Sequence, residues 1–403
     1  MDLSGGGGRF GPQGFYRQVA GRLSRGVKLY LGPGRKGPRY ADYPGPGRKP
    51  LRPPTAAVYA GAGASHSWLW FADFLENFGF SKAVFVDEND VAEGALDRAD
   101  AFLVSGGETF AMARGLGRAG KEAVEKLLGR GGLYWGACAG ACMMMRSTTE
   151  PLGLFDLARV KIANLADTLP EPVTPSLKYS TPYGCSHVFH PVRDEVLLSL
   201  HGAPPVYGRG KLAAPLFGGP PMEPSEDVRA LAVYSGFTSR TRYLASPEAA
   251  RDILVSKVAV CAKRIGPGLL LLSGPHLEHP DYPAANALVA DALYFSLPAE
   301  PPPEPKTSAR PPDKKALKDF KREASNIRIA AEGLCRHADL HWKVGRKYYE
   351  PEKAAAYAAA LWDRLLSLEK EPRPAGDPDL LLRAVETSRR TTEAVRELKA
   401  LAD

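Results

Sequence analysis

Between residues 56 and 296 the chain alternates short, mostly apolar runs with longer segments in which apolar residues recur at helical spacing. A strand that is apolar at every position is buried on both faces, as in a parallel sheet that helices cover on both sides. The pattern predicts an α/β domain with a doubly wound parallel sheet, whose loops after the strands build the functional site. The predicted strands are residues 56–59, 82–86, 101–104, 132–135 and 269–273, and the predicted helices are residues 68–78, 121–128, 139–145 and 283–295.

Two Gly/Pro-rich breaks divide the chain into four parts. Residues 1–54 hold thirteen Gly and eight Pro, which predicts a mostly irregular arm. Residues 297–315 are rich in proline and are expected to form a stiff, extended linker. The sequence therefore predicts a basic arm (1–54), an α/β domain (55–296), a linker (297–315) and a helical tail domain (316–403).

The tail has helical periodicity at residues 354–368 and again at residues 381–401, with a proline-containing break between them. Two or three helices in about 90 residues predict an antiparallel helical bundle. Such a bundle either packs on the α/β domain or on a second copy of the chain, or it docks a partner protein. The periodicity alone leaves both roles open.

Composition is that of a soluble globular protein, with 44% hydrophobic and 24% charged residues. No apolar run is long enough for a membrane span, and the N-terminus lacks the apolar segment of a secretory signal. The five cysteines are irregularly spaced, so we expect a reduced, cytoplasmic protein without disulfides. Five Asn and two Gln beside 36 Pro are typical of a thermophile, although a GC-rich genome gives part of the same bias.

The net charge of +8 is concentrated in the arm. Residues 1–54 carry eleven Lys/Arg and two Asp/Glu, a net charge of +9, which leaves the other 349 residues with a net charge of −1. The arm is therefore either solvated or binds nucleic-acid phosphates, while the rest of the chain has no basic character. The sequence gives no reason to expect a cofactor, a metal or a membrane partner.

The segment Gly136-Ala137-Cys138-Ala139-Gly140 lies between a predicted strand and a predicted helix and has the G-x-C-x-G pattern of a nucleophile elbow. Such a sharp turn needs very small residues around the nucleophile, because larger side chains would collide with the turn. The positive end of the following helix favours a thiolate at Cys138, and the N–H of Ala139 is free to bind an oxyanion. The pattern predicts a catalytic Cys138; the alternative is a buried structural cysteine.

A base and an orienting carboxylate follow a later strand. The apolar run 269–273 leads into Gly274-Pro275-His276-Leu277-Glu278. A thiol nucleophile needs a base within hydrogen-bond reach, and that base needs a carboxylate that orients it. His276 at the end of a strand, with Glu278 two residues later, can supply both.

A third motif, Ser105-Gly106-Gly107, follows the predicted strand 101–104. Glycines at this place allow backbone N–H groups to approach a reacting carbonyl. We therefore expect Gly106, Gly107 and Ala139 to form an oxyanion hole.

In these motifs the chain resembles the class I glutamine amidotransferase-like superfamily and, more narrowly, the biotin–protein ligase N-terminal-like family. The resemblance covers some 60% of the chain, about residues 56–296. It implies a flavodoxin-like sheet and a Cys-His-Glu triad, with Cys138 as nucleophile, His276 as base and Glu278 as its orienting group. It also implies Gly107 and Ala139 as the oxyanion donors. The residues that carry the resemblance are 58–65, 104–107, 131–141 and 272–278.

The chain departs from the family pattern at three places. Leu277 stands where many relatives have proline between the His and the Glu, and Ser105 stands where the oxyanion loop commonly begins with proline. Full biotin ligases carry a separate catalytic domain with a Gly-Arg-Gly-Arg loop. Residues 208–211, Gly-Arg-Gly-Lys, imitate that loop but lie inside the amidotransferase-like block. We therefore expect no biotin ligase activity.

Other residues carry chemistry that the triad does not use. Gly61, Gly63 and Ser65, in a glycine loop after the first strand, are expected to line the pocket above Cys138 and to contact substrate. Cys142, one helical turn after Cys138, is either a resolving thiol or part of the helix packing. Residues 207–211 form a Gly-rich basic loop, a candidate cover for the pocket. Two His/Cys groups lack a standard zinc spacing: Cys185, His187 and His190, and Cys335, His337, Asp339 and His341.

Three functions fit these residues. The first is an amidohydrolase or amidotransferase in which Cys138 attacks a small-molecule amide through a thioester. Glutamine is the substrate that the resemblance implies, and an acceptor of its ammonia would lie on another chain because no ATP motif occurs. The second is a non-catalytic ligand-binding or regulatory module, and the third is a thiol peptidase-like hydrolase.

Overall fold

The computed structural model describes residues 54–78, 80, 83–146, 154–165, 189–203, 206–295, 314–335, 342–344, 347–349, 354–355, 357–359, 361–362, 365–366 and 378–402. These residues form two compact units, which fall within Gly37–Pro305 and Lys306–Asp403. The division between them lies inside the proline-rich segment 297–315. None of the described helices is long and apolar enough to cross a membrane.

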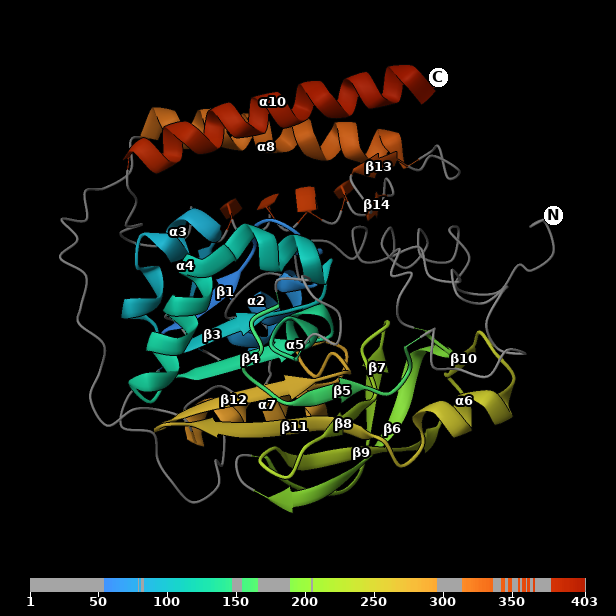
Figure 1. Ribbon diagram of the computed structural model, residues 1–403. Helices are drawn as coiled ribbons and strands as arrows, with labels where there is room; N and C mark the ends of the chain where they lie inside the picture. The colour runs from blue at the N-terminus through green and yellow to red at the C-terminus, as the bar shows by residue number, and fades with distance from the viewer. Residues whose placement is uncertain are drawn as a thin grey trace. The chain divides into compact units, whose positions relative to one another are not determined.

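The first unit is a mixed α/β structure built on one large sheet (Figure 1). Its strands are β1 (Ala56–Tyr59), β2 (Ala83–Val86), β3 (Ala101–Val104), β4 (Leu133–Ala137), β5 (Val160–Ile162), β6 (Val192–Ala203), β7 (Val206–Leu216), β8 (Met222–Pro224), β9 (Arg229–Phe237), β10 (Arg242–Tyr243), β11 (Val258–Ile265) and β12 (Gly268–Ser273). Its helices are α2 (Trp68–Asn77), α3 (Glu88–Ala92), the 3-10 helix η3 (Ala95–Arg98), α4 (Thr109–Gly129), α5 (Ala139–Met143), α6 (Pro247–Leu254) and α7 (Pro283–Phe295).

Five strands form a parallel core in the spatial order β2-β1-β3-β4-β12. β4 lies in its interior, where Trp135 is in register with Leu103 on β3 and with Leu271 on β12. Every strand predicted from the apolar runs belongs to this parallel core. The sequence therefore identified the α/β class and the core strands correctly.

Beyond β12 the sheet continues as antiparallel strands, which the expectation of a wholly parallel sheet missed. β11 pairs with β12, β9 with β11, and β6 with β9, β7 and β10. The β11–β12 hairpin turns at Gly266, whose φ of +57° suits glycine. Residues 207–211, considered as a loop over the pocket, lie in β7 instead.

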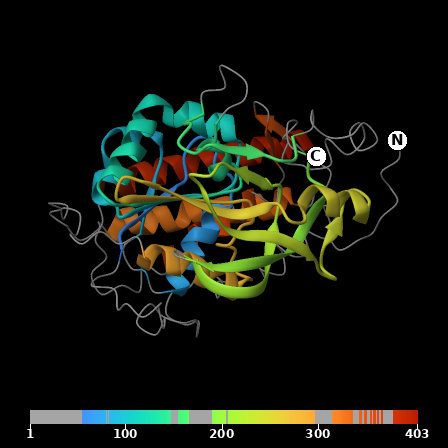
Figure 2. The same ribbon diagram turned by 60° about the horizontal axis from the view of Figure 1, so that its bottom comes forward.

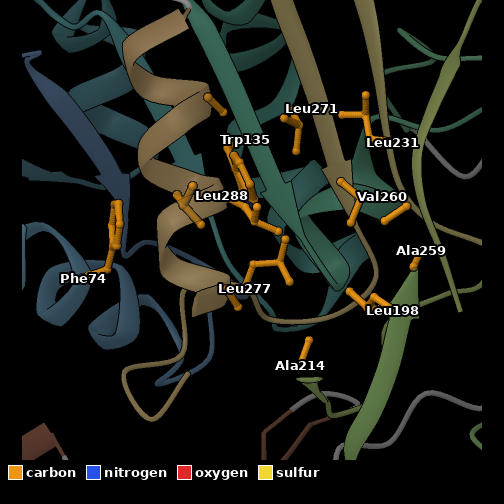
Figure 3. Packing of buried hydrophobic residues seen from close by; sticks show 14 of the residues in the cluster. Phe74, Trp135, Leu198, Ala214, Leu231, Ala259, Val260, Leu271, Leu277 and Leu288 are labelled. Carbon is orange, nitrogen blue, oxygen red and sulfur yellow. The ribbon is translucent and has the colours of Figure 1, made fainter. Parts of the chain in front are cut away.

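Helices cover both faces of the parallel core, because successive residues of a strand point to opposite sides. On one face Trp135 and Leu271 pack with Leu288 of α7 and Phe74 of α2 (Figure 3). On the other face Tyr134 packs with residues of α4 and α5. Figure 2 shows α4 and α2 on opposite sides of the sheet. The doubly wound arrangement is thus what the fully apolar strands predict.

The second unit contains α8 (Lys314–Leu334), α10 (Pro378–Ala402) and a hairpin of β13 (Trp342–Val344) and β14 (Lys347–Tyr349). The two long helices run parallel, since Gly333 lies beside Lys399 and Glu323 lies near Arg389. The two helices are not consecutive in the chain, so their parallel direction does not contradict the antiparallel bundle that the sequence predicts.

The reason for the parallel pairing is a helical stretch between the two long helices. Ala355 and Ala358 pack against Cys335 and the last turns of α8, whereas Trp362 lies under Lys321 and Arg328, further toward its start. This stretch therefore runs opposite to α8. The chain then returns for α10, which restores the direction of α8. The three-residue strands of the hairpin are too short for periodicity to detect.

Candidate active site

Cys138 lies in a strained turn between β4 and α5. Its φ of +53° and ψ of −114° are unusual for a residue with a side chain. The turn is held by a bond of 2.8 Å from the Cys138 N–H to the carbonyl oxygen of Ser273. A Cβ on Gly136 would lie 2.5 Å from the oxygen of Gly140, and a Cβ on Gly140 would overlap the oxygen of Val104. The turn therefore has the tight geometry for which the elbow motif requires glycine.

His276 and Glu278 follow β12 and form a buried pair beside Cys138. The His276 Nδ1 and the Glu278 Oε1 are 2.7 Å apart, and the two residues are 2% and 0% exposed. The Cys138 side chain is hydrogen-bonded to His276. Because Nδ1 faces the carboxylate, Nε2 is the ring nitrogen left for the sulfur. The structure therefore brings the three predicted triad residues together in the order thiol, imidazole, carboxylate.

The loop that carries the pair is fixed by three hydrogen bonds, one to β7 and two from α7. The N–H of His276 donates to the oxygen of Pro215 in β7 at 2.9 Å. Asn286 of α7, 2% exposed, donates from Nδ2 to the oxygens of Leu277 (2.7 Å) and His279 (3.0 Å), on either side of Glu278. Asn286 thus clamps the loop, a role that no local pattern in the sequence reveals.

The environment of His276 favours its protonated form. Burial is the largest single influence and would lower the pKa of the imidazole. The charge of Glu278, the hydrogen bonds to Cys138 and Glu278, and the charge of Cys138 together outweigh burial and raise the pKa of His276 to about 10. The surroundings of the imidazole therefore favour a proton on His276 next to the sulfur of Cys138.

The predicted oxyanion residues border the same site. Gly106 lies against the imidazole of His276, since a Cβ there would be 2.9 Å from the His276 Cε1. Gly107 forms a bridge with Ala64, and the N–H of Gly140 donates to the oxygen of Ser105 at 3.2 Å, which ties the loop to α5. Within the described ranges, the backbone N–H groups of Gly106, Gly107 and Ala139 have no acceptor. They remain available to a ligand.

The glycine loop before α2 packs on the oxyanion loop. The oxygen of Gly61 accepts from Ala64, and that of Gly63 accepts from the N–H of Glu108 at 2.9 Å. Ser65 is buried, and its Oγ lies 2.7 Å from the Oγ of Ser67. Gly61, Gly63 and Ser65 are thus placed to support the oxyanion loop; a substrate contact by any of them stays a prediction.

Aromatic rings border His276 where the sequence predicted no site residue. The ring of Trp70, from α2, meets the His276 imidazole edge-on at 4.9 Å, and the ring of Phe217 lies 6.0 Å from it. Both rings are half-buried, and they lie 5.6 Å from each other. Helical spacing placed Trp70 in a helix without indicating which neighbour it meets, and Phe217 follows a strand that was not predicted.

The remaining candidates do not join the triad. Cys142 is half-buried in the first turn of α5, and its N–H donates to the oxygen of Cys138, as helix packing requires. Cys335 is buried in the second unit. Cys185, His187, His337, Asp339 and His341 lie outside the described residues. In the part of the chain that is described, no group of three His, Cys, Asp or Glu side chains is arranged to hold a metal ion.

His190 is 6% exposed, and burial, followed by the positive charge of Arg193, lowers its pKa to about 3. Above about pH 7.5 the residue is neutral in both the folded and the unfolded chain, so it has no effect on the pH dependence there. Below that pH the unfolded chain binds a proton that the native chain excludes. In the native chain this should lower the free energy of unfolding by about 1 kcal/mol for each pH unit from pH 6.5 down to pH 3. In His190→Gln we expect this decrease to be absent.

Urea denaturation at several pH values measures this effect. His201→Gln is the matched control, because it makes the same replacement at an exposed histidine. An identical acid profile in the native chain and in His190→Gln would contradict the prediction.

No family model and no curated protein matches the chain. Solved structures are similar to parts of it. A protein of Thermoplasma acidophilum described as a candidate GMP synthase subunit is 13% identical, and the match covers 60% of this chain and 94% of that one, with a TM-score of 0.38. A β-galactosidase from Bacillus circulans sp. alkalophilus is 13% identical over 56% of this chain and 26% of its own, with a TM-score of 0.33. A cytoplasmic protein from Salmonella typhimurium is 10% identical over 57% and 86%, with a TM-score of 0.36. Likeness at this level assigns neither a family nor an activity to this chain.

Proposed function

We propose that the chain is a cysteine-dependent amidohydrolase or amidotransferase-like enzyme with a Cys138-His276-Glu278 triad. The observation that carries the proposal is the buried His276–Glu278 pair, 2.7 Å between Nδ1 and Oε1, hydrogen-bonded to a cysteine in a positive-φ turn. A nucleophile, a base in reach of it and a carboxylate that orients the base are the three groups needed for acyl transfer.

In the proposed reaction, the Cys138 thiolate attacks the amide carbonyl and forms a tetrahedral intermediate. The free N–H groups of Gly107 and Ala139 stabilise its oxyanion. The His276 imidazolium gives its proton to the nitrogen as the C–N bond breaks, which releases ammonia or an amine and leaves a thioester. The neutral imidazole then takes a proton from water, the hydroxide attacks the thioester, and the acid leaves as Cys138 and His276 return to their first state.

The arrangement of the sheet supports a flavodoxin-like core. The parallel strands have the spatial order second-first-third-fourth-fifth, the order of flavodoxin-like sheets. Gly107, Cys138 and His276 follow the third, fourth and fifth of these strands at their carboxyl ends, where such sheets bind ligands. This placement agrees with the resemblance to the class I glutamine amidotransferase-like superfamily and to the biotin–protein ligase N-terminal-like family.

The proposal predicts that Cys138 reacts rapidly with iodoacetamide at pH 6, where an ordinary thiol of pKa about 8.5 is almost wholly protonated. The rate in the native chain should stay close to its value at pH 9. In His276→Ala the rate at pH 6 should fall by a few hundredfold, the factor by which an ordinary thiol is depleted of thiolate at that pH. Mass spectrometry of the labelled peptide gives the rate.

Two controls make the result specific. Cys138 and Cys142 lie between Arg130 and Arg146 with no Lys or Arg between them, so one tryptic peptide carries both, and a Cys142→Ser background assigns the label to Cys138. His201→Ala, the same change at an exposed histidine, should leave the rate unchanged. If the alkylation rate has the pH dependence of an ordinary thiol in every variant, the non-catalytic binding module becomes the favoured interpretation.

Ammonia release then separates the two kinds of thiol enzyme. Incubation with glutamine and with other primary amides should release ammonia in the native chain and not in Cys138→Ala. An activated thiol that releases no ammonia, but cleaves a peptide bond, would favour the thiol peptidase-like function.

A further inference from the structure

A chain of buried serine hydroxyls leads to the triad from the side opposite Cys138. The Oγ of Ser105 lies 2.7 Å from the Oε1 of Glu278 and 2.8 Å from the Oγ of Ser67. The Oγ of Ser67 lies 2.7 Å from that of Ser65. The three serines are 3%, 2% and 9% exposed. The hydroxyls join two loops that are far apart in the sequence to the carboxylate of Glu278.

The number of protons that each group can donate sets the direction of the hydrogen bonds between these side chains. A carboxylate only accepts hydrogen bonds, and each hydroxyl has a single proton to donate. Ser105 therefore donates to Glu278, and its oxygen is left to accept from the hydroxyl of Ser67, which also lies 3.4 Å from the carbonyl oxygen of Gly106. Among the described residues, the other carboxylate oxygen, Oε2, has no partner. The Glu278 carboxylate is thus held by two donors, Ser105 and His276, both on Oε1.

On the basis of the proposed function, we propose that Ser105 is a fourth member of the site, a positioning residue whose hydroxyl fixes the Glu278 carboxylate so that His276 keeps its Nδ1 proton and presents Nε2 to Cys138. Two donors that approach one oxygen from different residues define where that oxygen lies. With His276 alone, the carboxylate can rotate about its own axis, because nothing in the described structure holds Oε2.

The side chain of Ser105 can be tested apart from its backbone. Its carbonyl oxygen accepts from Gly140, and this bond does not depend on the hydroxyl. Ser105→Ala therefore removes the donor to Glu278 and keeps the tie between the oxyanion loop and α5. A hydrogen bond to a charged group is among the stronger ones in proteins, so its loss should have a measurable effect on the pair.

The test follows the Nδ1 proton of His276 by proton NMR of the full chain with ¹⁵N-labelled histidine. A proton in a short bond to a buried carboxylate gives a low-field signal that exchanges slowly with water, and its disappearance in His276→Ala assigns it. We expect Ser105→Ala to move this signal upfield or to lose it to exchange. Ser105→Thr, which keeps a hydroxyl, should retain it.

The rate of Cys138 alkylation at pH 6 provides the second readout. It should fall about tenfold or more in Ser105→Ala. Ser225→Ala is the matched control, because it also removes a serine hydroxyl from a carboxylate, that of Asp227, at a place outside the site. This control should change neither the NMR signal nor the rate.

An unchanged signal and rate in a folded Ser105→Ala would overturn the proposal. If native Cys138 proves unreactive, the proposed function fails, yet the NMR signal still shows whether Ser105 orders the His276–Glu278 pair. If Ser105→Ala does not fold, Ser105→Cys decides, because it keeps the volume of the side chain but has only a weak S–H donor: a shifted or lost signal supports the proposal, and an unchanged one overturns it.

Discussion

Glu278→Gln is expected to slow amide hydrolysis by Cys138 about 10³- to 10⁴-fold while the chain stays folded. Glutamine has nearly the shape of glutamate, so the 0% exposed site can hold it. Its amide, however, has no charge to stabilise the His276 imidazolium, and its NH₂ group can donate to Nδ1. The imidazole would then place its proton on Nε2, toward the sulfur, and would no longer act as a base. The corresponding change in a serine-type triad costs about 10⁴-fold.

The measurement is the initial rate of ammonia release from the primary amide that the native chain hydrolyses fastest. Glu195→Gln is the matched control, since Glu195 is also a buried carboxylate, 4% exposed, that accepts from a hydroxyl, the Oγ1 of Thr238 at 2.7 Å. It lies outside the triad, and its replacement should change the rate by only a few fold. If Glu278→Gln keeps more than a tenth of the native rate, Glu278 does not orient the base.

The turn at Cys138 is the part of the candidate site that the sequence predicts best, because its geometry is set locally. A turn as sharp as the one at Cys138 excludes side chains at Gly136 and Gly140, so the need for glycine is visible as a motif. The pair of His276 and Glu278 is local in the same sense, since they are only two positions apart. Motifs of this kind carry their own geometry.

Contacts between segments that are far apart in the sequence cannot be recognised from a local sequence motif. Ser105 and Glu278 are 173 residues apart, and the half-buried rings of Trp70 and Phe217 come from different elements. Nothing in the local spacing of any of these residues indicates its partner. Ser105 and Glu278 become neighbours because β3, β4 and β12, which precede their loops, lie side by side in the sheet. The contacts around the proposed triad therefore depend on strand order, which the spacing of apolar residues does not encode.

The antiparallel part of the sheet was missed for a related reason. β7 contains two glycines and a proline, and β6 and β9 mix buried with half-exposed positions. These strands have neither the continuous apolar run of a core strand nor a clean alternation. Their pairing comes from the β6–β7 hairpin and from β11, which returns along β12. Cross-strand partners stabilise such strands more than their own sequence does.

Trp135→Ala is expected to lower the free energy of unfolding by about 3–5 kcal/mol, the range for removing a large buried aromatic side chain. Trp135 is 0% exposed and lies on β4 in the interior of the sheet, packed against Leu271 and α7 (Figure 3). Urea denaturation followed by circular dichroism measures the change. Trp68→Ala is the control, since Trp68 is half-buried and should cost less.

The same substitution should also reach the site, because Trp135 is three residues before Cys138 and β4 ends at the strained turn. Loss of the ring leaves a cavity under the strand, and a less rigid strand holds the positive φ of Cys138 less firmly. Trp135→Phe separates packing from polarity: the Trp135 Nε1 is buried without an acceptor among the described residues, so phenylalanine removes an unsatisfied donor and fills most of the space. We therefore expect Trp135→Phe to lower the free energy of unfolding much less than Trp135→Ala does, and to keep the alkylation rate of Cys138 at pH 6. An equal decrease of the free energy of unfolding and of the alkylation rate in both variants would contradict this and show that the indole N–H has a partner on which the turn depends.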